Sequence, residues 1–577
     1  MVMFASQLTA TTFSPSFLNS APSDTTRSPF LALAHLRYNR TFFPTRRRLV
    51  VSSRLNSSRS SGAGGSVDNG DVPYELHHDF SPQRETKGSP VFVTLPVNTV
   101  GPEGKISRPR AMMFSLKALA AAGVEGVVVE FWWGIIERKE PRVYDWRGYR
   151  ELVMMACMCG LKVRAVLAFH QYGTGPDDPN HYCLALEIEL VRHLQVLSPR
   201  HSSYSGSLSP LCRIPLPLWV LDEINKDPEL AYSDRFGRRN IEYISLGCDT
   251  LPVLRGRTPI QAYADFMRDF RETFRPSLGL TITRVQIGMG PGGELRYPSF
   301  SFQKPNVASS GGLGEFQCYD KYMLASLNAC ARKIGKREWG DGGPFGAGSL
   351  TQNPEHTDFF KNEGGSWNTP YGKFFLEWYS NMLLLHGERI CREAETIFRG
   401  TEVLISAEVA AIHWHYAIQS HPSELTAGYY NTFDRDGYLP IARLFSKYGF
   451  AICCSCFEMQ DATMQKINPS GSPEGFLKQL LLAARLCDIS LEGQNFTTDL
   501  DDDAFSQVLK MSKFYSDGIE KRPFAFNFVR MNKRMFETQN WDRFARFVRQ
   551  MSSGKILQAR LRAQLGSSSS YSLTFKL

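Results

Sequence analysis

The most informative part of this chain is IGMGPGGELRYPS, residues 287–299. An apolar run typical of a buried β-strand, Ile282–Met289, leads into glycines that are followed by a glutamate, an arginine and a tyrosine. Four glycines among residues 287–293 let backbone or ligand come close where side chains would obstruct. A lone glutamate in such a setting is more often part of a structural ion pair, so the case for chemistry at Glu294 depends on the whole thirteen-residue string.

Similar strand-like runs alternate with helix-like runs along most of the chain. We predict strands at Pro90–Leu95, Gly126–Phe131, Val163–Phe169, Ile282–Met289, Val403–Ile412, Phe450–Phe457, Ile489–Leu491 and Phe524–Val529. We predict helices at Ser115–Ala122, Tyr149–Cys159, Glu315–Ile334, Lys373–Phe398 and Glu474–Leu486. Eight strands separated by helices predict an α/β fold, a (β/α)8 TIM-type barrel with long active-site loops.

Polar and aromatic side chains gather where several predicted strands end. In such a barrel the functional groups lie at the carboxyl ends of the strands and in the loops that follow. The clusters are Glu130-Phe131-Trp132-Trp133-Gly134, His170-Gln171-Tyr172-Gly173, Gly293-Glu294, Ile412-His413-Trp414 and Gly493-Gln494-Asn495. Single histidines and tryptophans are commonly core residues, so it is the shared strand-end position that favours a binding site.

The net charge of +9 is concentrated in the first 60 residues. That segment holds eight arginines against one acid, Asp24, a surplus of seven, which leaves two of the nine net positive charges for everything after it. A nucleic-acid partner is therefore not expected. The Ser-, Thr- and Arg-rich, acid-poor composition predicts a transit peptide, with the chloroplast (plastid stroma) as the expected location and a mitochondrion as the alternative.

The expected organisation has three parts. Residues 1–70 are predicted to be transit peptide and flexible linker, residues 71–551 the barrel, and residues 552–577 a disordered tail. Residues 181–213 are predicted to be an insertion, because they are Ser-rich and match no motif of the barrel. No apolar run approaches the roughly 18 residues that span a bilayer, so no membrane span is expected.

Cofactors and metals are not expected. The cysteines at 453, 454 and 456 lie in a strand-like run and lack a second pair at zinc-site spacing. The glycines before Glu294 superficially resemble a dinucleotide fingerprint, but Pro291 and Pro298 break the helix that this fingerprint requires.

The motif around Glu294 closely resembles the signature around the proton-donating glutamate of plant β-amylases. Further ordered matches extend the resemblance over most of residues 88–551; they are EFWWGIIE (130–137), YDWR (144–147), GEFQCYDKY (314–322), FFLEWYS (374–380), ELTAGYYN (424–431) and RDGY (435–438). The resemblance implies inverting hydrolysis of α-1,4-glucans such as starch and maltodextrin, with release of maltose from the non-reducing end.

The chemistry implied by the resemblance needs two carboxyl groups. A protonated acid donates to the leaving oxygen, and a carboxylate roughly 6.5–9.5 Å away activates water on the opposite ring face. Glu294 matches the acid, but the position of the base is Gln494, whose amide cannot take a proton from water near neutral pH. General-base assistance contributes roughly 10²–10⁴ in rate.

The resemblance also assigns substrate-binding positions. His170, His413, Asn495 and Arg530 match the residues of the family directly, and Asp178 holds the lid-aspartate position. Four positions depart from the family: Glu130 stands for Asp, Ser455 for Thr, Glu408 for a substrate-binding Lys, and Phe496 for a small residue. Pro176 and a lost glycine are expected to stiffen the lid loop.

Two functions follow from these matches. The first is a plastid β-amylase with Glu294 as general acid, whose activity is weak or absent because Gln494 replaces the base. The second is a non-catalytic protein that binds glucan or a protein partner and regulates starch breakdown. The departures at Gln494, Glu408 and the lid favour impaired hydrolysis.

Overall fold

The computed structural model describes residues 88–173, 213–300, 312–350, 352–497, 500–516 and 524–552. The predicted transit peptide, most of the predicted insertion, the lid positions Pro176 and Asp178, and nearly all of the predicted tail lie outside these ranges.

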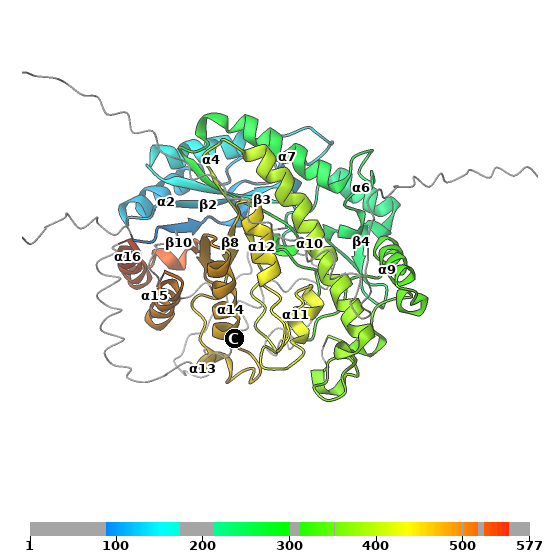
Figure 1. The fold of residues 1–577 in the computed structure, drawn as a ribbon. Coiled ribbons are helices and arrows are strands. Elements are labelled where there is room, and N and C mark those ends of the chain that lie inside the picture. The colour runs from blue at the N-terminus through cyan, green and yellow to red at the C-terminus, as the bar shows by residue number, and fades with distance from the viewer. Residues whose placement is uncertain are drawn as a thin grey trace, which may run out of the picture. The chain divides into compact units, whose positions relative to one another are not determined.

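Eight parallel strands close into a barrel in the order β1-β10-β9-β8-β7-β6-β3-β2 (Figure 1). They are β1 (Val91–Thr94), β2 (Gly126–Trp132), β3 (Lys162–Ala168), β6 (Ile282–Ile287), β7 (Leu404–Glu408), β8 (Ala451–Cys454), β9 (Leu491–Gln494) and β10 (Phe524–Phe528). Each predicted strand is present, so the predicted (β/α)8 class is confirmed. A two-stranded antiparallel sheet, β4 (Ala231–Ser233) and β5 (Arg239–Ile244), follows β3 and was not predicted.

Helices surround the barrel (Figure 1). They are α2 (Pro109–Ala121), α3 (Trp133–Ile136), α4 (Arg147–Met158), α6 (Leu218–Lys226), α7 (Pro259–Thr273), α9 (Lys321–Lys333), α10 (Pro370–Phe398), α11 (Pro422–Ala427), α12 (Leu439–Lys447), α13 (Asp461–Met464), α14 (Pro473–Leu486), α15 (Asp502–Ser516) and α16 (Thr538–Ser552). None of the helices in the described ranges combines the length and apolar character needed to cross a membrane.

The predicted helix at Glu315–Ile334 begins six residues later than expected. Asp320 is its N-cap, because its carboxylate accepts hydrogen bonds from the backbone N–H groups of Tyr322 and Met323 at 3.1 and 3.0 Å. The apolar side chains before it, such as Phe316 and Cys318, are buried without helical structure. Their apolar spacing was therefore wrongly interpreted as the first turns of a helix.

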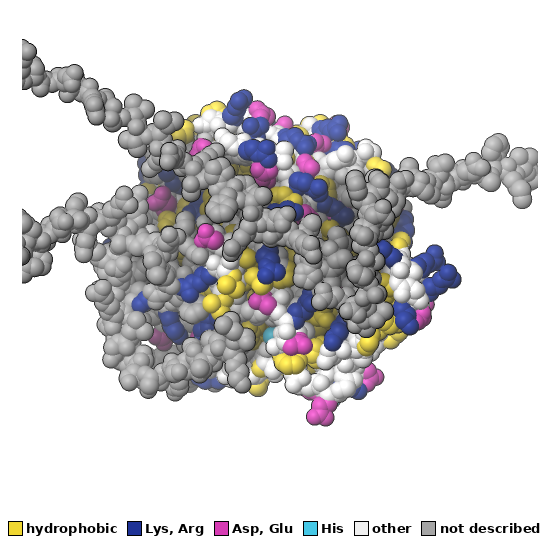
Figure 2. Space-filling model, viewed as in Figure 1, with side chains coloured by type: hydrophobic (Ala, Val, Ile, Leu, Met, Phe, Trp, Pro, Cys, Tyr) yellow, Lys and Arg dark blue, Asp and Glu magenta, His cyan; other side chains and the backbone are white. Residues whose placement is uncertain are grey.

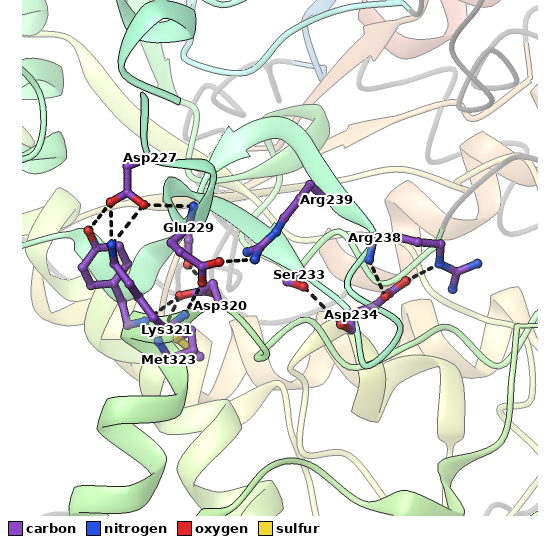
Figure 3. Close-up of polar contacts among 11 residues, drawn as sticks. Asp227, Glu229, Ser233, Asp234, Arg238, Arg239, Asp320, Lys321 and Met323 are labelled. Atoms are coloured by element: carbon purple, nitrogen blue, oxygen red, sulfur yellow. Dashed lines mark hydrogen bonds and ion pairs between the residues drawn. The ribbon is translucent and has the colours of Figure 1, made fainter. Parts of the chain in front are cut away.

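A network of polar contacts holds the β4–β5 sheet against the start of α9 (Figure 3). Asp227 accepts from Lys321 Nζ at 2.8 Å, while Glu229 accepts from the Lys321 backbone N–H at 2.6 Å and pairs with Arg239 on β5. These contacts join the start of α9 to the segment before β4 and to β5.

The interior of the barrel holds an apolar cluster beside a polar one. Phe92, Val128, Val166 and Ala525 form a buried apolar cluster. A polar layer lies beside it, in which the Glu492 carboxylate pairs with Arg164 at 2.5 Å and with Arg284 at 2.6 Å. Glu492 and Arg164 are almost completely buried, so this charge depends on its partners.

Charged side chains on the surface are mixed in sign. On the face in Figure 2, Lys and Arg side chains are interspersed with Asp and Glu. This agrees with the nearly even charge balance that the sequence predicts for the residues after the leader.

Replacing Arg164 with Met is expected to lower the free energy of unfolding by about 3–5 kcal/mol, because it leaves Glu492 under-compensated in the interior. Urea unfolding followed by tryptophan fluorescence measures this. The matched control is Arg399→Met, since Arg399 pairs with Glu395 on the surface of α10 and its loss should change little. Equal losses in both variants would contradict a structural role for the buried pair.

Candidate active site

The predicted site residues within the described ranges all lie at the carboxyl end of the barrel. Glu130 is near the end of β2, and Glu408 and Gln494 are the last residues of β7 and β9. The other site residues lie in the loops that follow the strands: His170, Glu294, His413, Ser455, Asn495, Phe496 and Arg530. Parallel strands bring these ends together although they are far apart in sequence. Asp178 belongs to a part of the chain that the structure does not describe.

Backbone conformations that suit glycine shape the loop that carries Glu294. Gly292 and Gly293 have φ values of 64° and 86°, in the left-handed region that other residues rarely adopt. A Cβ atom on Gly293 would also lie 3.4 Å from His170 Cε1. The glycines thus let the acid loop turn tightly against the end of β3.

Contacts from neighbouring elements fix this loop. Glu242 on β5 accepts a hydrogen bond from the Gly292 N–H at 2.8 Å, and the Leu295 N–H donates to the Glu408 carbonyl oxygen at 2.9 Å. His386 on α10 lies between Asp249 and the Met289 carbonyl oxygen, each 2.9 Å from a ring nitrogen. The backbone on both sides of Glu294 is therefore held by packed elements.

The carboxyl group of Glu294 is partly exposed. Arg296 Nε donates to Glu294 Oε2 at 2.5 Å, and the Glu294 side chain is 20% exposed. Within the described ranges, the other carboxyl oxygen has no side-chain partner.

Gln494 occupies the predicted base position with its amide engaged on both atoms. Its Nε2 donates to Glu408 Oε1, and its Oε1 lies 3.6 Å from Cys453 Sγ, within reach of a weak hydrogen bond from the thiol. Cys453 and its neighbours Cys454 and Cys456 are buried free thiols. Within the described ranges, no three His, Cys, Asp or Glu side chains are grouped as metal ligands.

Glu408 is a buried carboxyl group in contact with two glutamines. Its Oε2 accepts from Gln286 Nε2 at 2.9 Å, and its Oε1 accepts from Gln494. Burial, and next the carboxylate of Glu294, raise the pKa of Glu408 to about 8. Glu408 is therefore largely protonated at neutral pH.

Two histidines of the site are neutral because they are buried. Burial, with a smaller effect of Arg296, lowers the pKa of His170 to about 3. Burial lowers the pKa of His413 to about 4, although the hydrogen bond to the Ala411 carbonyl oxygen opposes the shift. Among the described residues, His170 Nδ1, His413 Nε2 and Trp132 Nε1 are buried without a hydrogen-bond partner. Buried polar atoms normally have partners, so these three are suited to the hydroxyl groups of a ligand.

Glu130 and Arg530 form a bidentate ion pair, with distances of 2.9 and 3.1 Å. Their side chains are 18% and 22% exposed, and Arg530 also lies 6.0 Å from the ring of Tyr172. The ion pair thus joins β2 to the loop that follows β10.

Asn495 and Phe496 make their described contacts with backbone and with Glu458. Asn495 Oδ1 accepts from the Val529 N–H at 2.8 Å, and its Nδ2 donates to the Val529 carbonyl oxygen. The Phe496 N–H donates to Glu458 Oε1 at 2.8 Å. Asn495 therefore joins the ends of β9 and β10, and its sugar-binding role stays a prediction, as does that of the buried Ser455.

The sequence interpretation missed several residues that shape the site, namely Arg164, Glu242, Gln286, Arg296 and Glu458. Arg164 carried a detectable signal, because a charged residue inside the apolar run Val163–Phe169 must face a partner when the strand is buried. Glu242 contacts Gly292, and Glu458 contacts Phe496. These partners are far apart in the sequence, so their contacts leave no periodic pattern in it.

The pKa of Glu408 predicts how stability depends on pH. The folded state keeps a proton on Glu408 up to a pH of about 8, whereas the unfolded chain releases it near pH ~4.3. The free energy of unfolding therefore falls as the pH rises through this window. In Glu408→Gln, which has no such proton, this loss should be absent, so the variant gains stability relative to the unaltered protein as the pH rises.

Thermal unfolding of both proteins between pH 5 and 9 measures this difference. Glu395→Gln on the surface of α10 serves as the control, since Arg399 holds the pKa of Glu395 below its usual range. A Glu408→Gln curve that runs parallel to that of the unaltered protein would contradict the raised pKa.

Comparison with known proteins agrees with the barrel and the strand-end site. The sequence profile of glycosyl hydrolase family 14 matches residues 92–188 and 187–556. The two matched segments meet inside the predicted insertion, whose extent stays a prediction.

Two plant proteins and one bacterial structure illustrate the likeness. "Beta-amylase 1, chloroplastic" from Arabidopsis thaliana is 46% identical over 472 residues, covering 81% of this chain and 76% of that protein. "Beta-amylase 2, chloroplastic" from Oryza sativa subsp. japonica is 44% identical over 488 residues, covering 84% and 81%. The crystal structure of the catalytic domain of β-amylase from Paenibacillus polymyxa aligns with a TM-score of 0.61 at 22% identity, covering 81% of this chain and all of that chain, which shows a shared fold.

Proposed function

Since the chain belongs to glycosyl hydrolase family 14, the β-amylases, as its motifs predicted, we propose that it binds the non-reducing ends of α-1,4-glucans but hydrolyses them weakly or not at all. The observation that carries this proposal is the amide of Gln494 at the base position, bonded to Glu408. The acid Glu294 is present, but the group that would take a proton from water is missing.

The retained groups support glucan binding. Neutral His170 and His413, together with Trp132, offer buried polar atoms that have no partner among the described residues. The buried side chain of Trp132 also packs edge-on against that of His170, with ring centroids 5.1 Å apart, so these two side chains belong to one cluster. Glu130 and Arg530 add charged groups at the rim.

The chemistry explains why binding and hydrolysis separate. With Glu294 on one side of the sugar ring, inversion requires a carboxylate to deprotonate water on the other side. An amide can hold that water but cannot accept its proton. The loss of the base raises the barrier by about 3–5 kcal/mol, which corresponds to a rate lower by roughly 10²–10⁴.

A second function, favoured by the same substitution, is regulation without catalysis. A protein that occupies glucan ends without cleaving them, or that binds a partner protein, would modulate starch breakdown in the plastid. The acid-poor leader and the relatives named chloroplastic support a plastid location.

Glucan binding is tested by titrating maltoheptaose into the protein and following heat or tryptophan fluorescence. His170→Ala and His413→Ala should each weaken binding about fivefold, because each removes a hydrogen bond worth ~1 kcal/mol. The control is His356→Ala, since His356 is exposed outside the site. Unaltered affinity in the two site variants, or no binding by the unaltered chain, would contradict the proposal.

Hydrolysis is tested by maltose release from soluble starch beside an active member of the family. The unaltered protein should release maltose at a rate lower by roughly 10²–10⁴, and Glu294→Gln should remove whatever activity remains while maltoheptaose still binds. A rate equal to that of the active enzyme would show that another group supplies the base.

A further inference from the structure

We propose that Glu408 is a second determinant of the missing activity, because its carboxyl group holds the side chain at position 494 and prevents any carboxylate placed there from acting as a base. This inference rests on the proposed function, since it concerns the base of that same site. It predicts that the two departures from the family, at 408 and 494, act as one coupled unit.

The contacts beneath Glu408 fix which of its oxygens can carry a proton. The Arg164 guanidinium can only donate, and it donates to Gln286 Oε1. The amide of Gln286 is thereby oriented with its Nε2 toward Glu408, to which it donates at 2.9 Å. Glu408 Oε2 is therefore an acceptor, and a proton on this carboxyl group lies on Oε1 when the Gln494 amide turns its oxygen toward that atom.

Glu408 Oε1 is the oxygen that contacts Gln494. An amide is suited to this position in either protonation state, since it can donate to a carboxylate through its Nε2 or, after rotation, accept from a carboxylic acid through its Oε1. A glutamine at 494 therefore satisfies Glu408 whether or not the proton is present.

A glutamate at 494 meets a different situation. Two carboxyl groups in hydrogen-bond contact cannot both ionise and instead share one proton. The new carboxylate would accept that proton from Glu408 Oε1, so its lone pair would be engaged by its neighbour rather than by water. Gln494→Glu alone should then fail to create a base.

Among the described residues, no positively charged side chain is hydrogen-bonded to Glu408 to relieve this pairing. The charged and titratable groups that interact with it are Arg164 on β3, Glu294 in the acid loop, Glu130 on β2, Cys453 and Cys454 on β8 and Tyr429 after α11. Arg164 already pairs with Glu492 at 2.5 Å. Burial and then the Glu294 carboxyl group raise the pKa of Glu408, whereas Arg164 and the hydrogen bond from Gln286 oppose the shift.

The test is a double-mutant cycle of the full chain: the unaltered protein, Gln494→Glu, Glu408→Gln and the double variant. Urea unfolding at pH 7 and 8 gives the midpoint of each. We expect Gln494→Glu to lower the midpoint when Glu408 is present and to have much less effect in the Glu408→Gln background, where an amide can donate to the new carboxylate. Equal effects in the two backgrounds would overturn the proposal, because residues that interact must be non-additive.

Maltose release gives a second readout. Gln494→Glu alone should release no more maltose than the unaltered protein, and combining it with Glu408→Lys or Glu408→Gln should raise release by a factor of ten or more, part of the roughly 10²–10⁴ that a base contributes. A tenfold gain in Gln494→Glu alone would overturn the proposal. If Glu408→Lys fails to fold, the isosteric Glu408→Gln carries the test.

Failure of this proposal is distinguishable from failure of the proposed function. The unfolding cycle needs no ligand, so it decides on the contact between positions 408 and 494 alone. Absence of maltoheptaose binding by the unaltered protein would remove the proposed function and leave the outcome of the cycle intact.

Discussion

A continuous series of buried polar contacts runs inside the barrel and constrains the side chains at its carboxyl end. It begins at Glu492, whose charge is balanced by Arg164 and Arg284, and continues from Arg164 to Gln286, then to Glu408 and finally to Gln494. In a buried environment each donor must meet an acceptor, because an unpaired polar group costs more than a formed bond returns. The identity of each side chain in this series therefore depends on its neighbour.

The constraint extends to the loops at the mouth of the barrel. Glu408 contacts the acid loop through its carbonyl oxygen, which accepts from the Leu295 N–H, while its carboxyl group contacts position 494. A single residue thus contacts both the loop of the predicted acid Glu294 and the predicted base position, Gln494. A lysine, which the sequence resemblance predicts at this position, would place a positive charge between two flanking carboxylates, whereas a carboxyl group suits an amide.

The groups proposed to bind glucan and the groups predicted to transfer protons lie in different parts of this site. The neutral histidines, Trp132 and the Glu130–Arg530 pair are held by burial and by rim contacts that do not involve Gln494. The proton transfer that hydrolysis needs depends on one carboxylate in one place. A chain can therefore lose the second property while its framework for the first stays folded, which is the physical basis for a glucan-binding role.

The sequence by itself determined the barrel and the strand-end position of the site. Apolar runs of strand length separated by amphipathic segments are a local property of the sequence, and parallel pairing then places the carboxyl ends of all strands on one side. Glu294, and the amide instead of a carboxylate at Gln494, could likewise be located from the order of the sequence motifs. Only the tertiary structure decided that Gln494 contacts Glu408, 86 residues away, and that Asn495 is hydrogen-bonded to the backbone of Val529. It also decided that helix α9 begins only after its N-cap, Asp320. These features depend on which side chains meet across the closed barrel and its loops, and hydrogen bonding between distant groups leaves no periodic signal in the chain.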